Sequence, residues 1–202
     1  MRRNEFVPEN YEKVELKFNT VWETIFNVIM FVVVGLIFAI PFSFIWSLSI
    51  EEIIYSAGLF DDGLLAGGDR QRLLIVVIVV VIGVVVHEFL HGVFYARYMK
   101  NGFKSIKMGV KFPFAYCESK EVMRTNEYIV GLIMPMIILG IIPAIISIFI
   151  GHAYLLLFGV FFTAAGSSDL LIFFKISKDR KSTWFENLPS INKWYVYKPI
   201  KR

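Results

Sequence analysis

Residues 73–98, LLIVVIVVVIGVVVHEFLHGVFYARY, contain the feature that decides how this chain folds. The stretch is mostly apolar and long enough to cross a bilayer as a helix, which takes about 20 residues. His87, Glu88 and His91 interrupt it. Polar side chains inside such a run are costly unless something compensates them. The stretch therefore predicts a membrane helix that carries a functional site.

The composition of the whole chain agrees with this reading. Of the 202 residues, 56% are hydrophobic, and the mean hydropathy is +0.62. With these values the chain is more apolar than an ordinary soluble domain of this length. We expect an all-α polytopic membrane protein, a single membrane-embedded domain over residues 1–202 with a cytoplasmic tail at 177–202. Its four expected transmembrane helices cover residues 24–49, 73–98, 128–150 and 153–176.

The distribution of Lys and Arg predicts the orientation in the membrane. The segment before the first span has four of these residues, the three loops have two, seven and none, and the tail has eight. Because positively charged segments tend to stay in the cytoplasm, both termini and the second loop are expected there. The basic residues flank apolar blocks and are expected to set topology, so the net charge of +4 is no evidence for a nucleic-acid partner. The lipid bilayer is the expected partner of the apolar helices.

The second loop and the tail have patterns of their own. Residues 102–122, GFKSIKMGVKFPFAYCESKEV, alternate apolar and polar side chains, which is typical of strands. We expect a small cytoplasmic β-hairpin-like loop at the membrane surface, with an amphipathic loop without strands as the alternative. The tail mixes aromatic and basic residues. It suits either an anionic membrane surface or packing on the second loop.

The polar residues of the second span form a metal-binding pattern. His87 and His91 are four residues apart, so on a helix they share one face. Two imidazoles in this HExxH spacing can bind one zinc ion, and Glu88 between them suits a general base acting on water. A chance match is rare, and rarer inside a span, where His and Glu are uncommon. The pattern predicts Zn²⁺ ligands at His87 and His91 and a catalytic role for Glu88.

A catalytic zinc site needs a third protein ligand, and Asp169 is the best candidate. It is the only acidic residue of the fourth span. With a rise of about 1.5 Å per residue, Asp169 and His91 both lie about 11 Å from the cytoplasmic ends of their helices, and His87 about 17 Å. The site is therefore expected in the cytoplasmic half of the bilayer. The alternative for Asp169 is a carboxylate bonded to Ser167, Ser168 or the backbone, or a protonated carboxyl group.

Other polar residues near the spans are weaker candidates. A folded-back loop would be needed to bring Glu118, Glu121 or Glu127 to the metal. His152 lies at the opposite surface and is expected to be a solvated loop residue. Asn126, just before the third span, is either a helix cap or a group that orients a substrate carbonyl.

Small residues and prolines surround the pattern. Gly83, Gly92 and the stretch AAGSS at 164–168 predict close approach of the second and fourth spans, because small residues let membrane helices pack tightly. Ordinary tight packing without a shared metal is the alternative. Pro135 and Pro143 are expected to distort the third span and to free backbone groups near the site.

These features together resemble a known family. HEFLHG in a hydrophobic helix is followed by a basic loop with strand-like alternation, a proline-bearing span and then Asp169. Over residues 73–176 this order resembles the site-2 protease class of intramembrane zinc metallopeptidases. It is more similar still to a bacterial family of zincin peptidases related to that class. In site-2 proteases the third ligand is usually an Asp followed by Gly, whereas Asp169 is followed by Leu170.

The resemblance implies a zinc-dependent metalloendopeptidase that cleaves a membrane-protein or peptide substrate within or near the membrane. Two other functions use the same metal chemistry. One is a non-proteolytic metal-binding regulator, and the other is a metal-dependent lipid amidase.

Overall fold

The computed structural model describes residues 10–49, 51–52, 70–111, 114–179, 183–188 and 193–200. Among these residues, four helices are long and apolar enough to cross a membrane. They cover Thr20–Trp46, Leu74–Ala96, Thr125–Ile150 and Ala153–Ile176. The prediction of four long apolar helices is therefore confirmed, with ends that differ by a few residues.

The first two spans are continuous helices and the last two are interrupted. The first two are α1 (Thr20–Trp46) and α3 (Arg70–Ala96). The third consists of α4 (Thr125–Pro135), a π-helix (Met136–Ile141) and α5 (Ile142–Ile150). The fourth consists of α6 (Ala153–Ala165) and α7 (Ser167–Ile176). Pro135 ends α4 and Pro143 lies in the first turn of α5, so the predicted distortion of the third span is confirmed.

The second loop folds into a hairpin, as predicted. β2 (Ile106–Lys111) pairs antiparallel with β3 (Phe114–Ser119), and Ile106 lies opposite Ser119. A short 3-10 helix, Gly102–Ser105, precedes β2. Residues 112–113, which follow β2 and precede β3 in the sequence, lie outside the described residues.

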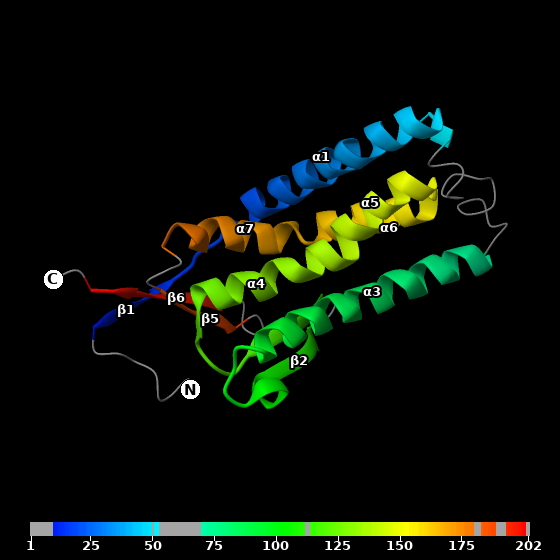
Figure 1. The fold of residues 1–202 in the computed structure, drawn as a ribbon. Coiled ribbons are helices and arrows are strands. Elements are labelled where there is room, and N and C mark those ends of the chain that lie inside the picture. Colours follow the sequence, from blue (N-terminus) through cyan, green and yellow to red (C-terminus); the bar gives the residue numbers. More distant parts are fainter. Residues whose placement is uncertain are drawn as a thin grey trace. The chain divides into compact units, whose positions relative to one another are not determined.

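A four-stranded antiparallel sheet joins segments that are far apart in the sequence. Its order is β1-β6-β5-β4, and Figure 1 shows β1 in blue beside β6 in red. The strands are β1 (Tyr11–Glu15), β4 (Met123–Arg124), β5 (Trp184–Leu188) and β6 (Lys193–Pro199). No pattern in the sequence predicted this sheet. Because β5 contacts β3, the tail packs on the second loop, which was one of the two expected alternatives.

Contacts divide the chain into two compact units, and the prediction of a single domain stays a prediction. One unit comprises residues 1–23, 85–135 and 168–202, and the other comprises 24–84 and 136–167. The core of the first unit brings helix ends and sheet together through Tyr95, Tyr128, Ile172, Phe185 and Val196. The core of the second is built from α1 and α6 through Val34, Phe42, Leu156 and Val160.

Glycines set the close packing of the third and fourth spans in the second unit. A Cβ added at Gly159 would lie 2.4 Å from the backbone N of Ala144. A Cβ added at Gly140 would lie 2.5 Å from the backbone N of Thr163. Helix backbones approach this closely only where a side chain is missing, which is a common way to pack helices in lipid.

The glycines next to the HExxH pattern have different partners. A Cβ added at Gly83 would lie 2.1 Å from the Phe162 ring in α6, which confirms the predicted approach of the second and fourth spans at this point. At Gly92 that prediction is wrong. The nearest atoms to a Cβ there are the Ile106 Cγ2 at 3.4 Å and the Cys117 Sγ at 3.5 Å. Gly92 therefore seats the β2–β3 hairpin on α3.

We expect Gly159→Ala to destabilise the protein by about 1 to 3 kcal/mol, the usual cost of forcing an extra group into a packed core. The added methyl group meets backbone at Ala144, which cannot rotate away. Gly35→Ala in α1 is the matched control, because nothing lies within 4 Å of a Cβ there. Unfolding in detergent measures both variants. Equal stability of the two would contradict the close packing.

Candidate metal site

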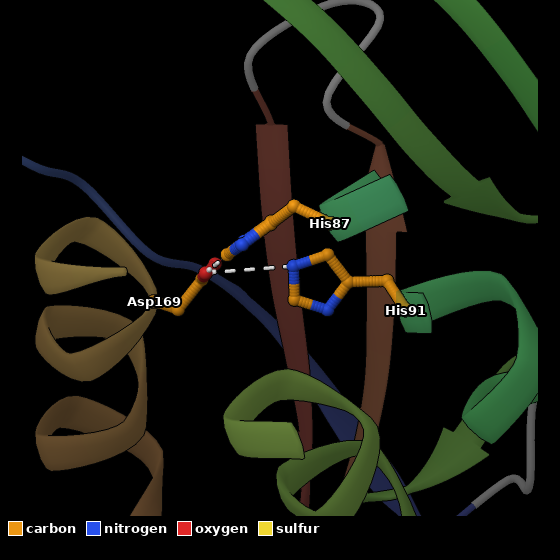
Figure 2. Close-up of side chains that lie close together, drawn as sticks. All are labelled: His87, His91 and Asp169. Carbon is orange, nitrogen blue, oxygen red and sulfur yellow. Dashed lines mark hydrogen bonds and ion pairs between the residues drawn. The ribbon is translucent and has the colours of Figure 1, made fainter. Parts of the chain in front are cut away.

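Three predicted ligands meet between α3 and α7. His87 and His91 are buried on one face of α3, with ring centroids 4.9 Å apart. Asp169 lies in the first turn of α7. Its Oδ2 is 3.3 Å from Nε2 of His87 and 3.4 Å from Nε2 of His91. Figure 2 shows the carboxylate pointing at both rings.

The three side chains fit a tetrahedral zinc ion. One donor atom from each residue lies within 4.8 Å of the others. With zinc bonds of about 2.0 to 2.2 Å in tetrahedral geometry, neighbouring donor atoms are about 3.3 to 3.5 Å apart. The two nitrogen–oxygen distances, 3.3 and 3.4 Å, lie in this range. Two imidazoles and one carboxylate are also a donor set that zinc accepts while keeping a fourth position free.

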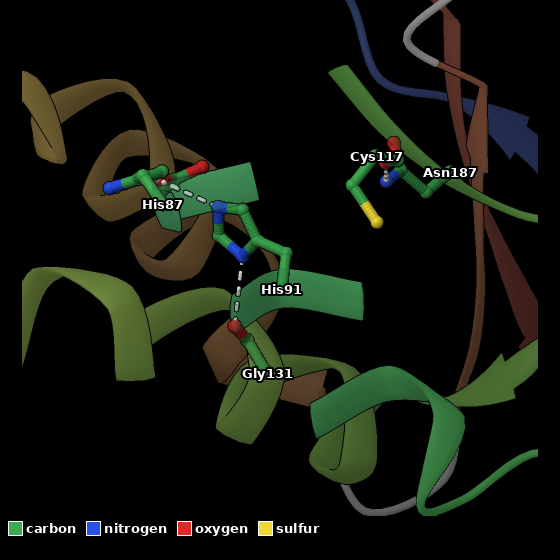
Figure 3. Close-up of polar contacts among 6 residues, drawn as sticks. His87, His91, Cys117, Gly131 and Asn187 are labelled. Atoms are coloured by element: carbon green, nitrogen blue, oxygen red, sulfur yellow. Dashed lines mark hydrogen bonds and ion pairs between the residues drawn. The ribbon is translucent and has the colours of Figure 1, made fainter. Parts of the chain in front are cut away.

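The ring of His91 is oriented by a backbone carbonyl that a proline sets free. Nδ1 of His91 donates a hydrogen bond to the carbonyl oxygen of Gly131, at 2.9 Å (Figure 3). That carbonyl would normally bond the N–H four residues later, but residue 135 is a proline and has no N–H. The bond leaves Nε2 of His91 directed at Asp169. The predicted freeing of backbone groups near the site is thus confirmed for Pro135.

Tyr95 covers the face of the His91 ring, and Gly131 leaves room for Tyr95. Tyr95 stacks on His91, with ring centroids 5.7 Å apart and planes at 11°. A Cβ added at Gly131 would lie 2.4 Å from the Tyr95 ring, so only glycine lets this part of α4 approach. The sequence analysis missed both residues. The available signals were that Tyr95 follows His91 by four residues and that Gly131 precedes Pro135 by four.

The break between α6 and α7 places Asp169. Gly166 separates the two helices, and a Cβ there would lie 2.9 Å from Cβ of Met136. α7 restarts at Ser167, so Asp169 occupies a first helical turn, where free N–H groups favour a negative charge. Ser167 donates its hydroxyl hydrogen to Oδ1 of Asn27, at 2.7 Å. Ser167 therefore donates its hydrogen bond to Asn27 and not to the Asp169 carboxylate.

Glu88 lies next to the donor group, half-buried on α3. Its carboxylate interacts electrostatically with both histidines and with Asp169, and the backbone N–H of Cys117 in β3 faces it. Nδ1 of His87 is buried and has no hydrogen-bond partner among the described residues. The ring of His87 is thus held by fewer hydrogen bonds than the ring of His91.

The other polar candidates have different roles. Glu121 accepts hydrogen bonds from the backbone N–H of Lys100 and from the side chains of Asn101 and Ser105. The remaining candidates lie at helix ends or in the hairpin. Glu127 accepts from the Arg124 N–H, His152 caps α6 by accepting from the Leu155 N–H, Asn126 is exposed in the first turn of α4, and Glu118 lies in β3 opposite Lys107.

Comparison with known proteins identifies the family. The model of a family described as "Putative zincin peptidase" matches residues 80–184, just over half of the chain. The chain belongs to this family. The matched region contains the histidine face of α3, the hairpin, Asp169 and the first residue of β5. The expected resemblance to zincin peptidases is confirmed, whereas the relation to site-2 proteases stays a prediction. No curated protein and no solved structure shows significant similarity to the chain.

We expect Pro135→Ala to weaken divalent-metal binding by about 10-fold or more, the usual effect of disturbing a group that orients a ligand. The new N–H would compete with Nδ1 of His91 for the Gly131 carbonyl. Pro143→Ala is the matched control, because it changes the same span in the first turn of α5. Competition with a chelator measures both affinities. Equal affinities would show that the Gly131 carbonyl does not need to be free.

The thiol of Cys117 is expected to be unreactive in the folded protein. Burial raises its pKa to about 12, and the carboxylates of Glu88 and Glu118 add to this effect. A raised pKa leaves less thiolate at a given pH, and the thiolate is the reactive form. Alkylation should therefore rise about tenfold per pH unit from pH 8 to 10, without the plateau near 9 expected of the unfolded chain. A plateau near 9 in the folded protein would contradict the burial.

Proposed function

We propose that this chain is a membrane-embedded zinc peptidase that hydrolyses peptide bonds of membrane or membrane-associated proteins. The observation that carries the proposal is the convergence of His87, His91 and Asp169 inside two candidate spans. Glu88 lies beside these donors. Membership of a zincin family adds the reaction class that such a site serves.

The chain's own residues divide the work of hydrolysis. When bound, zinc supplies Lewis-acid activation of water and polarises the scissile carbonyl. His87, His91 and Asp169 hold the ion, and the Gly131 carbonyl fixes the ring of His91. Glu88 takes a proton from the attacking water and delivers it to the leaving amine. The backbone N–H of Cys117 in β3 lies on the side of the site where Glu88 stands.

The proposed location is an integral multi-pass membrane protein with both termini in the cytoplasm. The lysine and arginine counts assign the N-terminal segment, the second loop and the tail to that side. These same three segments contribute the strands of one sheet, which supports placing them on one side of the membrane. The site then opens toward the cytoplasm, from which water reaches it.

The relation to site-2 proteases is part of the proposal. The order of the HExxH helix, the hairpin, the interrupted third span and the later Asp supports it. The residue after Asp169 does not match, and in its place the glycine of this region comes before the Asp, where Gly166 ends α6. Close packing at this helix break therefore precedes the ligand in this chain.

We expect Glu88→Gln to abolish cleavage of a membrane substrate while zinc stays bound. Glutamine keeps the size of the side chain but cannot take up a proton, so the loss is confined to acid–base catalysis, which contributes about 100-fold to 10,000-fold. Glu127→Gln is the matched control, because Glu127 bonds the Arg124 N–H at the start of α4. Zinc content per chain is measured in parallel with cleavage in liposomes.

Full cleavage by the Glu88→Gln protein would sink the peptidase mechanism. If purified wild-type protein contains no zinc, and Asp169→Ala cleaves substrate as fast as wild-type protein, then these residues do not form a metal site. Mass spectrometry of molecules trapped by Glu88→Gln separates the alternatives. A trapped polypeptide that wild-type protein cleaves supports a peptidase, a trapped lipid amide indicates an amidase, and a stoichiometric uncleaved partner indicates a regulator.

A further inference from the structure

One strand of the terminal sheet directs two side chains toward the candidate site. Phe185 and Asn187 are alternate residues of β5, so they lie on the same face of the strand. Both are buried, with 1% and 5% of their surface exposed. Trp184 and Glu186 lie on the opposite face, where Glu186 binds Lys13 of β1 at 2.7 Å.

Phe185 starts a column of buried aromatic rings that ends at His91. Its ring centroid is 4.1 Å from that of Tyr128 in α4. Tyr128 stacks on Tyr95 at 5.0 Å with planes at 8°, and Tyr95 stacks on His91 at 5.7 Å with planes at 11°. The planes of Phe185 and Tyr128 are tilted by 31°, whereas the Tyr95 ring lies nearly parallel to both of its neighbours. Because each buried ring packs on the next, a shift of one ring displaces its neighbour. The orientation of His91 therefore depends on the position of β5.

Asn187 reaches the site by a second route. Its Nδ2 donates a hydrogen bond to the carbonyl oxygen of Cys117 in β3, at 3.2 Å (Figure 3). The N–H of the same residue lies against the Glu88 carboxylate. In an extended strand the N–H and C=O of one residue point to the same side. The edge of β3 that Asn187 holds is thus the edge that touches Glu88.

We propose that β5 is a positioning element for the site, with Phe185 holding the ring of His91 and Asn187 holding the part of β3 that contacts Glu88. The inference rests on the proposed function, and it makes the C-terminal tail a support of the proposed catalytic group. Ligands must be held within about 0.5 Å of their working geometry by packing around them. Two side chains of one short strand supply that support to both the metal ligand and the base.

The first test measures metal affinity in the full chain in detergent, using Co²⁺ absorption and competition with Zn²⁺. Phe185→Leu and Tyr128→Leu remove flat rings from the column and are expected to weaken binding by about 10-fold or more. They should also change the Co²⁺ spectrum, because the angle of the His91 ring changes. Tyr128→Phe keeps the ring, so its metal affinity and its Co²⁺ spectrum should equal those of the wild-type protein. Trp184→Leu, on the other face of β5, is the control for damage to the strand.

The second test uses Cys117, the only cysteine of the chain, as a reporter on β3. The rate of maleimide labelling at fixed pH measures how strongly the packing around β3 protects this buried thiol from reaction. Asn187→Ala is expected to speed labelling by about 10-fold, corresponding to loss of one buried hydrogen bond of about 1.4 kcal/mol. Trp184→Leu should label at the wild-type rate. This readout needs neither metal nor substrate.

The outcomes separate this inference from the proposed function. Wild-type metal affinity in both Tyr128→Leu and Phe185→Leu, with unchanged labelling in Asn187→Ala, would overturn the role of β5 even if wild-type protein binds zinc and cleaves. Equal losses in Trp184→Leu would also overturn it, because the effect would then be general damage to the sheet. If wild-type protein binds no metal, the proposed function fails, and the labelling of Cys117 alone decides whether β5 holds β3.

Discussion

The cost of placing two imidazoles and a carboxylate inside candidate membrane spans is the constraint on which the site depends. An aspartate at the centre of a membrane helix costs about 2.5 to 3.5 kcal/mol on insertion scales. Here Oδ2 of Asp169 faces Nε2 of both His87 and His91, so each polar group is met by another. The helix break at Gly166 and the free carbonyl of Gly131 are needed because this meeting requires a particular geometry on both sides.

The features that could be predicted from the sequence are those set by local properties. The four spans follow from long apolar runs, and the shared face of His87 and His91 follows from helical periodicity. Asp169 was reached by combining loop charges with the rise per residue, since both histidines and the carboxylate then have similar depth. The role of Pro135 also follows from local chemistry, because a missing N–H always leaves one carbonyl without its helical partner.

The features that the sequence did not predict depend on pairing between distant segments. β1, β4, β5 and β6 are short strands, and no local pattern specifies which of them are neighbours. The sequence shows that Gly92 allows close packing but not which segment packs there. The position of the β2–β3 hairpin makes Ile106 and Cys117 its neighbours. The aromatic tail was equally suited to lipid and to protein, because Trp and Tyr side chains combine apolar rings with polar tips. The contact between β5 and β3 places this part of the tail on the second loop.

The terminal sheet also constrains how many of the four candidate spans can cross a bilayer. β1 precedes the first span, β4 follows the second, and β5 and β6 follow the fourth. Strands that pair must lie on one side of a bilayer, so an even number of crossings must separate them. Two crossings between β1 and β4 and two more before β5 satisfy this condition, whereas three crossings in total would not. The backbone pairing uses no information from lysine or arginine, yet it requires the same parity that the loop charges indicate.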